Sequence, residues 1–266
     1  MPHNEPQIAN LQDFSDKAIN KIKYLFNQNS VIILKSIASK NLIEESLDFL
    51  QKEETNIIKK YLGDTRGLVV ENIEDKHYIK YFEHPLALNF SLFGRFINSD
   101  LINFCKELLD SRIYLRSVEI HCRNPGGTSI PMHQDNAYYG LHNGNACTIF
   151  IPLNKTLNSQ GELTYIKNKI GNEYPHNSSN ESAFSLEINE NDKNKLHKQD
   201  KINQIEISDG FVHHSHSVHY ADAVPSNSIR TWAVRITLVG LSDHIKVGHE
   251  DWYNEIVKRN RKNARI

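Results

Sequence analysis

A histidine and an aspartate two positions apart, His133 and Asp135, are the residues whose types and spacing most directly suggest chemistry. On a strand, side chains at i and i+2 share one face, so this imidazole and this carboxylate can point at a single site. Two histidines and one carboxylate form the ligand set of non-heme Fe(II) sites, because three protein ligands leave positions open for other molecules. The pair therefore predicts two of three metal ligands, and a second histidine is expected further along the chain.

The second histidine has several candidates in one short run, Gly210–Tyr220. Four histidines occupy this run: His213, His214, His216 and His219. Single histidines are more often hydrogen-bonded or surface residues than ligands, at roughly three to one, so the first three are expected to be structural. His219 is the preferred third ligand, and His216 or His214 takes the role if His219 does not.

Arg230 is the candidate for holding an anion beside this metal site. A short turn after His219 and an adjacent antiparallel strand could return the Arg230 side chain to the same cavity. A guanidinium is always charged and can make two parallel hydrogen bonds to a carboxylate. Arg235, on the same expected strand, Ile229–Val239, is the competing arginine.

Taken in order, these residues resemble the phytanoyl-CoA dioxygenase-like branch of the Fe(II)/2-oxoglutarate oxygenases. The likeness is carried by four runs and one arginine: His133–Tyr139, Ile149–Leu153, Gly161–Leu163, His213–Ala221 and Arg230. The resemblance implies Fe(II) held by His133, Asp135 and His219. It also implies 2-oxoglutarate as co-substrate, with three residues expected to bind it: Arg230, Thr148 and Arg123.

The resemblance implies a reaction in which O2 and 2-oxoglutarate are consumed to hydroxylate an unactivated C–H of a small molecule, with release of succinate and CO2. Related halogenases have a small residue at the position of Asp135, so hydroxylation is expected in place of halogenation. Two departures leave the substrate open. Lys167–Gly171 replaces a Gly-Ser-His element that is common in relatives, and Ala221 stands where some relatives have a serine.

Two other classes of function stay open. One is a cupin-like metalloprotein with non-oxidative chemistry, in which Arg230 binds a different anion. The other is a non-catalytic sensor that binds 2-oxoglutarate without turnover. Release of CO2 from 2-oxoglutarate that depends on Fe(II) would separate an oxygenase from both.

The strand expected just before the metal motif, Ser117–Arg123, alternates between apolar and polar side chains. Its polar face carries Ser117, Glu119, His121 and Arg123. An ordinary antiparallel strand turns such a face to water, but in the resemblance this strand lines the active-site cavity. We expect the cavity arrangement, with Tyr138 and Tyr139 covering the substrate. An unpaired Glu119 would be costly there, so it must meet a cation from the protein, with Arg123 as one candidate, or from the substrate.

The periodicity of apolar residues changes from about 3.6 to 2 near Ser111, which marks a switch from helices to strands. Residues 1–110 are expected to be mainly helical, with Ser39 and Ser99 as helix caps, and residues 111–245 to form the strands. The expected fold is a double-stranded beta-helix of the jelly-roll kind, cupin-like, with the N-terminal helices packed on one sheet. Residues 1–266 are expected to form one domain, with 171–203 as a lid or a flexible excursion.

Composition excludes few classes of function. The 31 basic and 32 acidic residues give a formal charge of −1, so no global field would attract nucleic acid or an anionic membrane. Three cysteines without CxxC spacing favour a reducing compartment, and the N-terminus has no secretory pattern, so the cytoplasm is the expected location. The expected partner is a small-molecule substrate, and the oligomeric state is left open.

Overall fold

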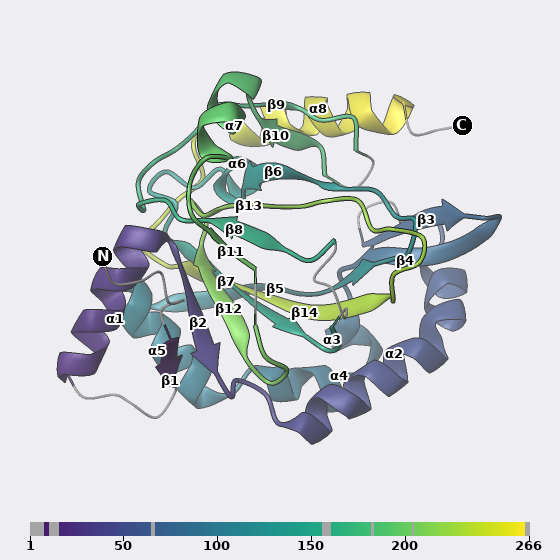
Figure 1. Cartoon of the computed structure of the whole chain (residues 1–266), viewed down its shortest axis with the longest axis horizontal. Helices are drawn as coiled ribbons and strands as arrows, with labels where there is room; N and C mark the ends of the chain where they lie inside the picture. The colour runs from purple at the N-terminus through teal and green to yellow at the C-terminus, as the bar shows by residue number, and fades with distance from the viewer. Residues whose placement is uncertain are drawn as a thin grey trace.

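The computed structural model describes residues 8–10, 16–64, 67–155, 161–181, 184–203 and 205–263, and the side chains of these ranges from residue 17 to residue 256 (Figure 1). Its larger sheet has eight strands in the order β1-β2-β12-β7-β14-β5-β4-β3. All neighbouring strands in it are antiparallel except β1 and β2. The bounds are β1 Ile8–Asn10, β2 Val31–Lys35, β3 Leu68–Ile73, β4 Lys76–Phe82, β5 Ile113–Arg123, β7 Ala146–Pro152, β12 Gly210–His214 and β14 Thr231–Gly240.

A smaller sheet and a separate hairpin face the larger sheet. The smaller sheet has the antiparallel order β11-β8-β13-β6, and the hairpin pairs β10 with β9. Their bounds are β6 Ile130–Gln134, β8 Thr164–Ile166, β9 His176–Ser178, β10 Leu186–Ile188, β11 Lys201–Ile202 and β13 Val218–Ala221. This two-sheet arrangement with added helices is a double-stranded beta-helix, as the periodicity predicted.

Helices cover the outer face of the larger sheet, below it in Figure 1. Three long helices take part, α1 Asp16–Asn29, α2 Lys40–Tyr61 and α5 Ser99–Leu109, with short helices α3 Pro85–Leu88, α4 Phe90–Phe93 and the 3-10 turn Gly94–Phe96 between them. Apolar residues of α2 and α5, such as Leu50 and Phe104, share one core with Ile120 and Val234 of the sheet. The N-terminal part thus packs on one sheet, and it also supplies four strands.

Two helix caps were predicted from the sequence. The Ser39 side chain accepts a hydrogen bond from the backbone N–H of Leu42, 3.2 Å away, as expected for an N-cap. The cap of α5 is Asn98, whose side chain accepts from the Leu101 N–H at 2.9 Å, so the prediction of Ser99 was wrong by one residue. Asparagine and serine cap with similar strength, and their order in the sequence does not decide between them.

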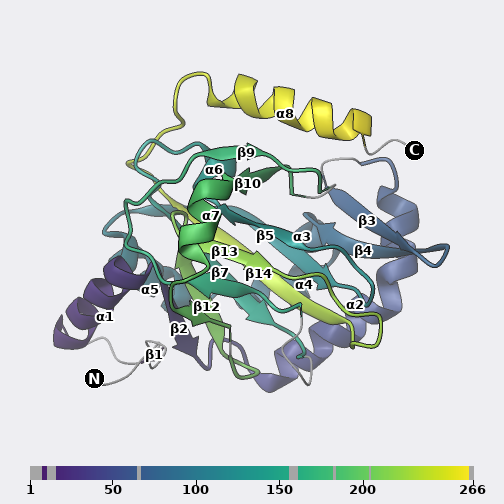
Figure 2. The ribbon, with the colours of Figure 1, turned by 45° about the horizontal axis from the view of Figure 1, so that its top comes forward.

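The segment expected to be a lid or a flexible excursion is folded across the smaller sheet. It contains β9, β10, β11 and the helix α7 Glu190–Leu196. Ile188 and Leu196 pack with Met132 and Val218 of the smaller sheet. A last helix, α8 His249–Asn263, lies along the top of the molecule beyond β9 and β10 (Figure 2). No helix in the described part of the chain is long and apolar enough to cross a membrane.

Candidate metal centre

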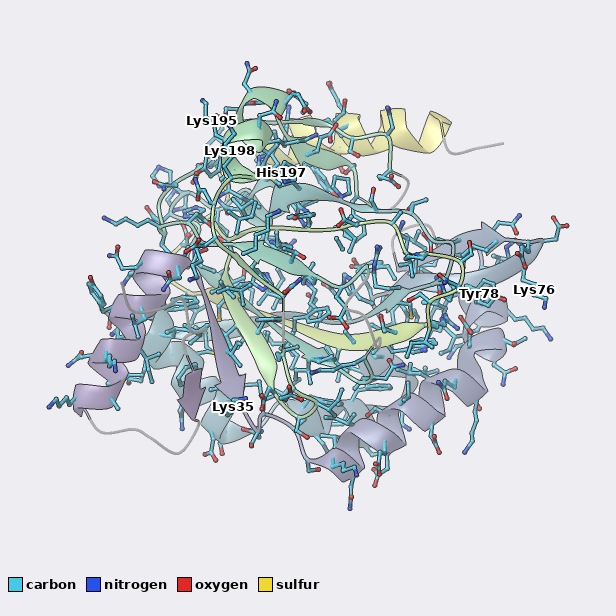
Figure 3. All side chains as sticks on the ribbon, viewed as in Figure 1. Lys35, Lys76, Tyr78, Lys195, His197 and Lys198 are labelled. Atoms are coloured by element: carbon cyan, nitrogen blue, oxygen red, sulfur yellow. The ribbon has the colours of Figure 1, made fainter. Side chains whose placement is uncertain are left out.

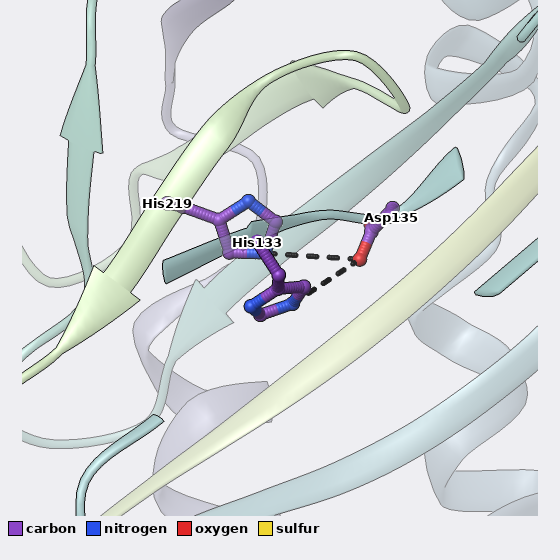
Figure 4. Close-up of side chains that lie close together, drawn as sticks. All are labelled: His133, Asp135 and His219. Carbon is purple, nitrogen blue, oxygen red and sulfur yellow. Dashed lines mark ion pairs between the residues drawn. The ribbon is translucent and has the colours of Figure 1, made fainter. Parts of the chain in front are cut away.

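Three predicted ligands lie together on the smaller sheet and the loop that follows it. His133 on β6 and His219 on β13 are directly paired across the two strands, and Asp135 follows the end of β6. Asp135 Oδ1 is 3.8 Å from His133 Nε2 and 3.7 Å from His219 Nε2, and all three residues are buried (Figure 4). Donors that each lie about 2.1 Å from one ion are separated by up to about 4.2 Å. The arrangement could therefore hold one metal ion.

Both histidines present the correct nitrogen to such an ion. His133 Nδ1 lies 2.7 Å from the Pro131 carbonyl oxygen, and His219 Nδ1 lies 3.1 Å from the Ser217 carbonyl oxygen. A carbonyl only accepts, so each Nδ1 carries the hydrogen and each Nε2 keeps its lone pair. Burial lowers the pKa of both imidazoles, which favours the neutral form that binds metals. The donor set and its tautomers fit a divalent transition metal.

Asp135 divides its two carboxylate oxygens between separate tasks. Oδ1 faces the histidines, whereas Oδ2 accepts four hydrogen bonds: from Arg235 at 2.7 Å, Thr148 at 3.0 Å, His213 at 3.0 Å and the Tyr139 hydroxyl at 3.1 Å. Burial by itself would raise the pKa of this carboxyl, but the Arg235 charge and the His213 hydrogen bond hold it well below its usual range. Asp135 is thus kept ionised, with one oxygen free for a metal.

His213 has a role that the sequence did not indicate. The Tyr165 hydroxyl donates to its Nδ1 over 2.9 Å, so its Nε2 carries the hydrogen that Asp135 accepts. Both side chains are buried. His213 was expected to be structural, and its support of the aspartate was not foreseen. The cross-strand pair His213–Thr148, two Asp135 donors on neighbouring strands, would have been the signal, and it requires the strand register.

The alternative third ligands lie outside the cavity that the triad faces. The His214 ring packs edge-on against Phe26, with ring centroids 6.0 Å apart, and His216 pairs with Glu173 at 3.0 Å. Neither lines the cavity. Of the four histidines in the run, His213 and His219 face the cavity, which is the expected pattern for a strand, a tight turn and a returning strand.

A cavity of about 850 Å³ opens in front of the triad, between the two sheets. The polar face of β5 points into it, so Ser117, Glu119, His121 and Arg123 all line the wall, as the cavity interpretation expected. Tyr138 also lines it and packs its ring edge-on against His133 at 5.3 Å.

Glu119 meets its cation within the protein. Arg235, its partner across β14, donates to Glu119 at 2.6 Å, and the Ser117 hydroxyl and His121 Nε2 lie 2.6 and 3.1 Å from its carboxylate. Although burial opposes ionisation, these contacts lower the pKa of Glu119 to about 2. The expected partner Arg123 is not the one observed, because Arg235 lies directly across from Glu119 on β14, whereas Arg123 lies four residues further along β5.

Arg230 lies on the opposite face of the larger sheet. Its guanidinium makes a two-pronged ion pair with Glu54 of α2, both contacts at 2.5 Å, and stacks over Trp232 at 4.1 Å. It also lies 5.3 Å from the ring of Tyr78, which Figure 3 labels beside the β3–β4 hairpin. The expectation that Arg230 faces the cavity was wrong, because alternation along β14 turns Thr231, Ala233 and Arg235 inward. Position 230 therefore falls on the helix-covered side.

Thr148 and Arg123, both expected at the co-substrate, differ in their placement. Thr148 supports Asp135 and does not line the cavity. Tyr139, expected to cover the substrate, does line the cavity and accepts a hydrogen bond from Arg235. Arg123 lines the cavity at the end away from Arg235 and donates to three backbone carbonyls, those of Gly161, Thr128 and Asp222. No ion-pair partner of Arg123 is found among the described residues, and burial lowers its pKa to about 10.

No model of a known protein family matches the sequence, and no curated protein matches it. Solved structures do match. The epimerase SnoN in complex with Fe3+, alpha ketoglutarate and nogalamycin RO is 12% identical, with 88% of each chain covered and a TM-score of 0.66. The non-heme alpha ketoglutarate dependent carbocyclase SnoK from nogalamycin biosynthesis is 13% identical, with 95% of this chain and 93% of that chain covered and a TM-score of 0.66.

A third similar structure is EctD from S. alaskensis with 2-oxoglutarate and 5-hydroxyectoine. It is 14% identical, with 92% of this chain and 84% of that chain covered and a TM-score of 0.65. At these identities the likeness establishes the double-stranded beta-helix fold. Of these three proteins, SnoN binds Fe3+ and alpha ketoglutarate, SnoK is alpha ketoglutarate dependent, and EctD binds 2-oxoglutarate. The phytanoyl-CoA dioxygenase-like branch itself stays an expectation from the sequence.

Proposed function

We propose that this chain is an Fe(II)- and 2-oxoglutarate-dependent dioxygenase that hydroxylates an unactivated C–H of a small molecule. In that reaction one oxygen atom of O2 enters the product and the other enters succinate, with release of CO2. The observation that carries the proposal is the buried His133, Asp135 and His219 triad facing a cavity large enough for a co-substrate and a substrate. With iron and 2-oxoglutarate bound, the site would supply the O2 activation that oxidation of a C–H bond requires.

The residues around the triad would hold it in one state. Two backbone carbonyls fix the ligand histidines as Nδ1–H tautomers, and Arg235 with its neighbours keeps Asp135 ionised and turned to the metal through Oδ1. Supporting contacts of this kind orient ligands and typically change metal affinity about 10- to 100-fold when removed. Arg235 therefore acts by positioning Asp135, and its own charge is already shared between Asp135 and Glu119.

The far carboxylate of 2-oxoglutarate needs a cation, and Arg230 does not fit this task because Glu54 occupies both prongs of its guanidinium. Arg123 is the better candidate. It lines the cavity, has no ion-pair partner among the described residues, and uses three of its five N–H groups on carbonyls. Arg123 pairs across β5 and β14 with Thr231, the first residue of β14. It therefore lies at the same end of the two strands as Arg230, the residue before Thr231.

Turnover with Fe(II) and 2-oxoglutarate tests the proposal directly. Succinate should form from 2-oxoglutarate in step with oxidation of a substrate from a small-molecule panel, and His133→Ala, Asp135→Ala or His219→Ala should abolish it. Arg123→Met should raise the KM for 2-oxoglutarate by at least about tenfold, the effect of losing a charge-assisted contact. Arg230→Met is the matched control and should leave that KM unchanged.

The test has three informative failures. Iron binding without succinate under any condition would favour a cupin-like protein with non-oxidative chemistry. Saturable binding of 2-oxoglutarate without CO2 release would favour a sensor. Succinate formation with a product that has gained no oxygen would move the reaction to epimerisation or ring closure, the activities named for SnoN and SnoK.

A further inference from the structure

His121 and Glu119 form a hydrogen-bonded pair in the cavity wall that the metal ligands do not need. His121 Nε2 lies 3.1 Å from Glu119 Oε2, and an ionised carboxylate can only accept, so Nε2 carries the hydrogen. Nδ1 of the same ring is then an acceptor when the imidazole is neutral. Among the described residues, this Nδ1 has no hydrogen-bond partner. It is also not one of the fully buried polar atoms that lack a partner in that part of the chain.

The pair is held rigidly. Glu119 is fixed by Arg235 and Ser117, so the carboxylate cannot turn away from His121. The His121 ring packs edge-on against Tyr81, with centroids 5.0 Å apart. Burial lowers the pKa of His121, which keeps the imidazole neutral and its Nδ1 lone pair available near neutral pH.

The pair also lies close to the metal centre. The ring of Phe184 contacts both His121 and His133, with centroid distances of 6.4 and 5.8 Å. Arg235 donates hydrogen bonds to both Glu119 and Asp135. His121 and the triad line the same cavity, so a small molecule that contacts His121 can also extend toward the triad. His121 keeps 14% of its side chain exposed, and it lines the cavity.

From this geometry we infer that His121 Nδ1 is the specificity-determining acceptor for a hydroxyl group of the substrate. A neutral donor fits better than a cation, because the charge of Glu119 is already balanced by Arg235 at 2.6 Å. The substrate class is then a neutral alcohol or polyol that is oxidised at a carbon near the bound hydroxyl. This inference names the substrate class for the proposed oxygenase and rests on that function.

The tautomer can be read without iron or turnover. In metal-free protein labelled with ¹⁵N-histidine, nuclear magnetic resonance should show His121 Nδ1 as a nitrogen without hydrogen and Nε2 as one with hydrogen. The His121→Gln variant assigns the signal by its loss. His197→Gln is the matched control, since His197 lies at the periphery beside α7 (Figure 3) and outside the cavity. A hydrogen on Nδ1 would overturn the inference.

The ligand class is tested on the same sample with a panel of simple alcohols, sugars and polyols, each paired with the ether in which every hydroxyl is O-methylated. Alcohols should move the Nδ1 signal and their ethers should not, because an ether has no hydrogen to donate. Equal shifts for both members of every pair, or no shift at all, would overturn the inference. For a substrate that turns over, His121→Phe should raise KM about tenfold for the alcohol, as expected for one lost hydrogen bond. Absence of Fe(II)-dependent succinate would instead count against the proposed oxygenase. The nuclear magnetic resonance result, obtained without metal, would still test the binding of alcohols at His121.

Discussion

The Arg230–Glu54 ion pair permits a sharp prediction, because two different roles for Arg230 give opposite results. If the pair is structural, Glu54→Gln should destabilise the fold and leave 2-oxoglutarate binding unchanged. Both side chains are largely buried, with 19% of Arg230 and 15% of Glu54 exposed. Burial disfavours the guanidinium charge, yet the hydrogen bonds that Arg230 donates to Glu54 leave the pKa of Arg230 raised. Removing the carboxylate leaves this buried cation without its ion-pair partner between α2 and the sheet.

The size of the effect follows from burial and geometry. Breaking a fully buried pair by removing one partner costs about 3–5 kcal/mol, and an exposed pair is worth about 0–1 kcal/mol. This pair is mostly buried and two-pronged, so Glu54→Gln should cost about 2–4 kcal/mol. Replacing both residues, as in Glu54→Gln with Arg230→Met, should cost less than the sum of the single changes, because no charge is then left without a partner.

Urea unfolding of the parent, the two single variants and the double variant measures this coupling. We expect a coupling free energy of about 1.5–3 kcal/mol and an unchanged KM for 2-oxoglutarate in the Arg230→Met variant. Additive destabilisation, with a KM raised tenfold or more, would refute the structural role and return Arg230 to the co-substrate.

Three further predictions concern the metal site and the charge network beside it. Because the pKa of Glu119 falls from 4.5 to about 2 on folding, its stabilisation is complete above about pH 4.5 and is lost as the pH falls toward 2. In the parent, this group should lower the unfolding free energy by up to roughly 3 kcal/mol as the pH falls across that window, and Glu119→Gln should remove this part of the pH dependence. The same pH dependence in the variant would contradict the pairing with Arg235. Thr148→Val removes one of four donors to Asp135 and should weaken Co(II) binding in calorimetry by about tenfold, whereas equal affinity would mean that the remaining donors suffice. Divalent metal should raise Tm with increasing concentration, and the shift should vanish in His219→Ala; a persistent shift would place the ion elsewhere.

Much of this protein is determined locally, within single stretches of sequence. The i, i+2 spacing of His133 and Asp135, the alternation along β5 and the helical spacing before residue 110 each depend only on the geometry of one strand or helix. That is why the switch from helices to strands, the two-sided character of β5 and the pairing of His133 with Asp135 could be predicted from the residues, whereas the inward direction of the polar face and the choice of His219 rested on the resemblance. Helix ends were less certain, as the cap at Asn98 shows, because neighbouring polar residues compete for the same backbone N–H groups.

Pairing between strands decided what the sequence alone did not. The partner of Glu119 is Arg235 because β14 lies directly across from β5 in this register, and Arg230 is turned to Glu54 because it falls one position out of phase with the inward residues. The same pairing puts His213 beside Thr148 and so beside Asp135. Such contacts join residues far apart in the chain, and a shift of one residue sends a side chain to the other face. The three candidate metal ligands could therefore be named before the structure was known, whereas deciding which of two arginines only five positions apart faces the cavity required the assembled sheet.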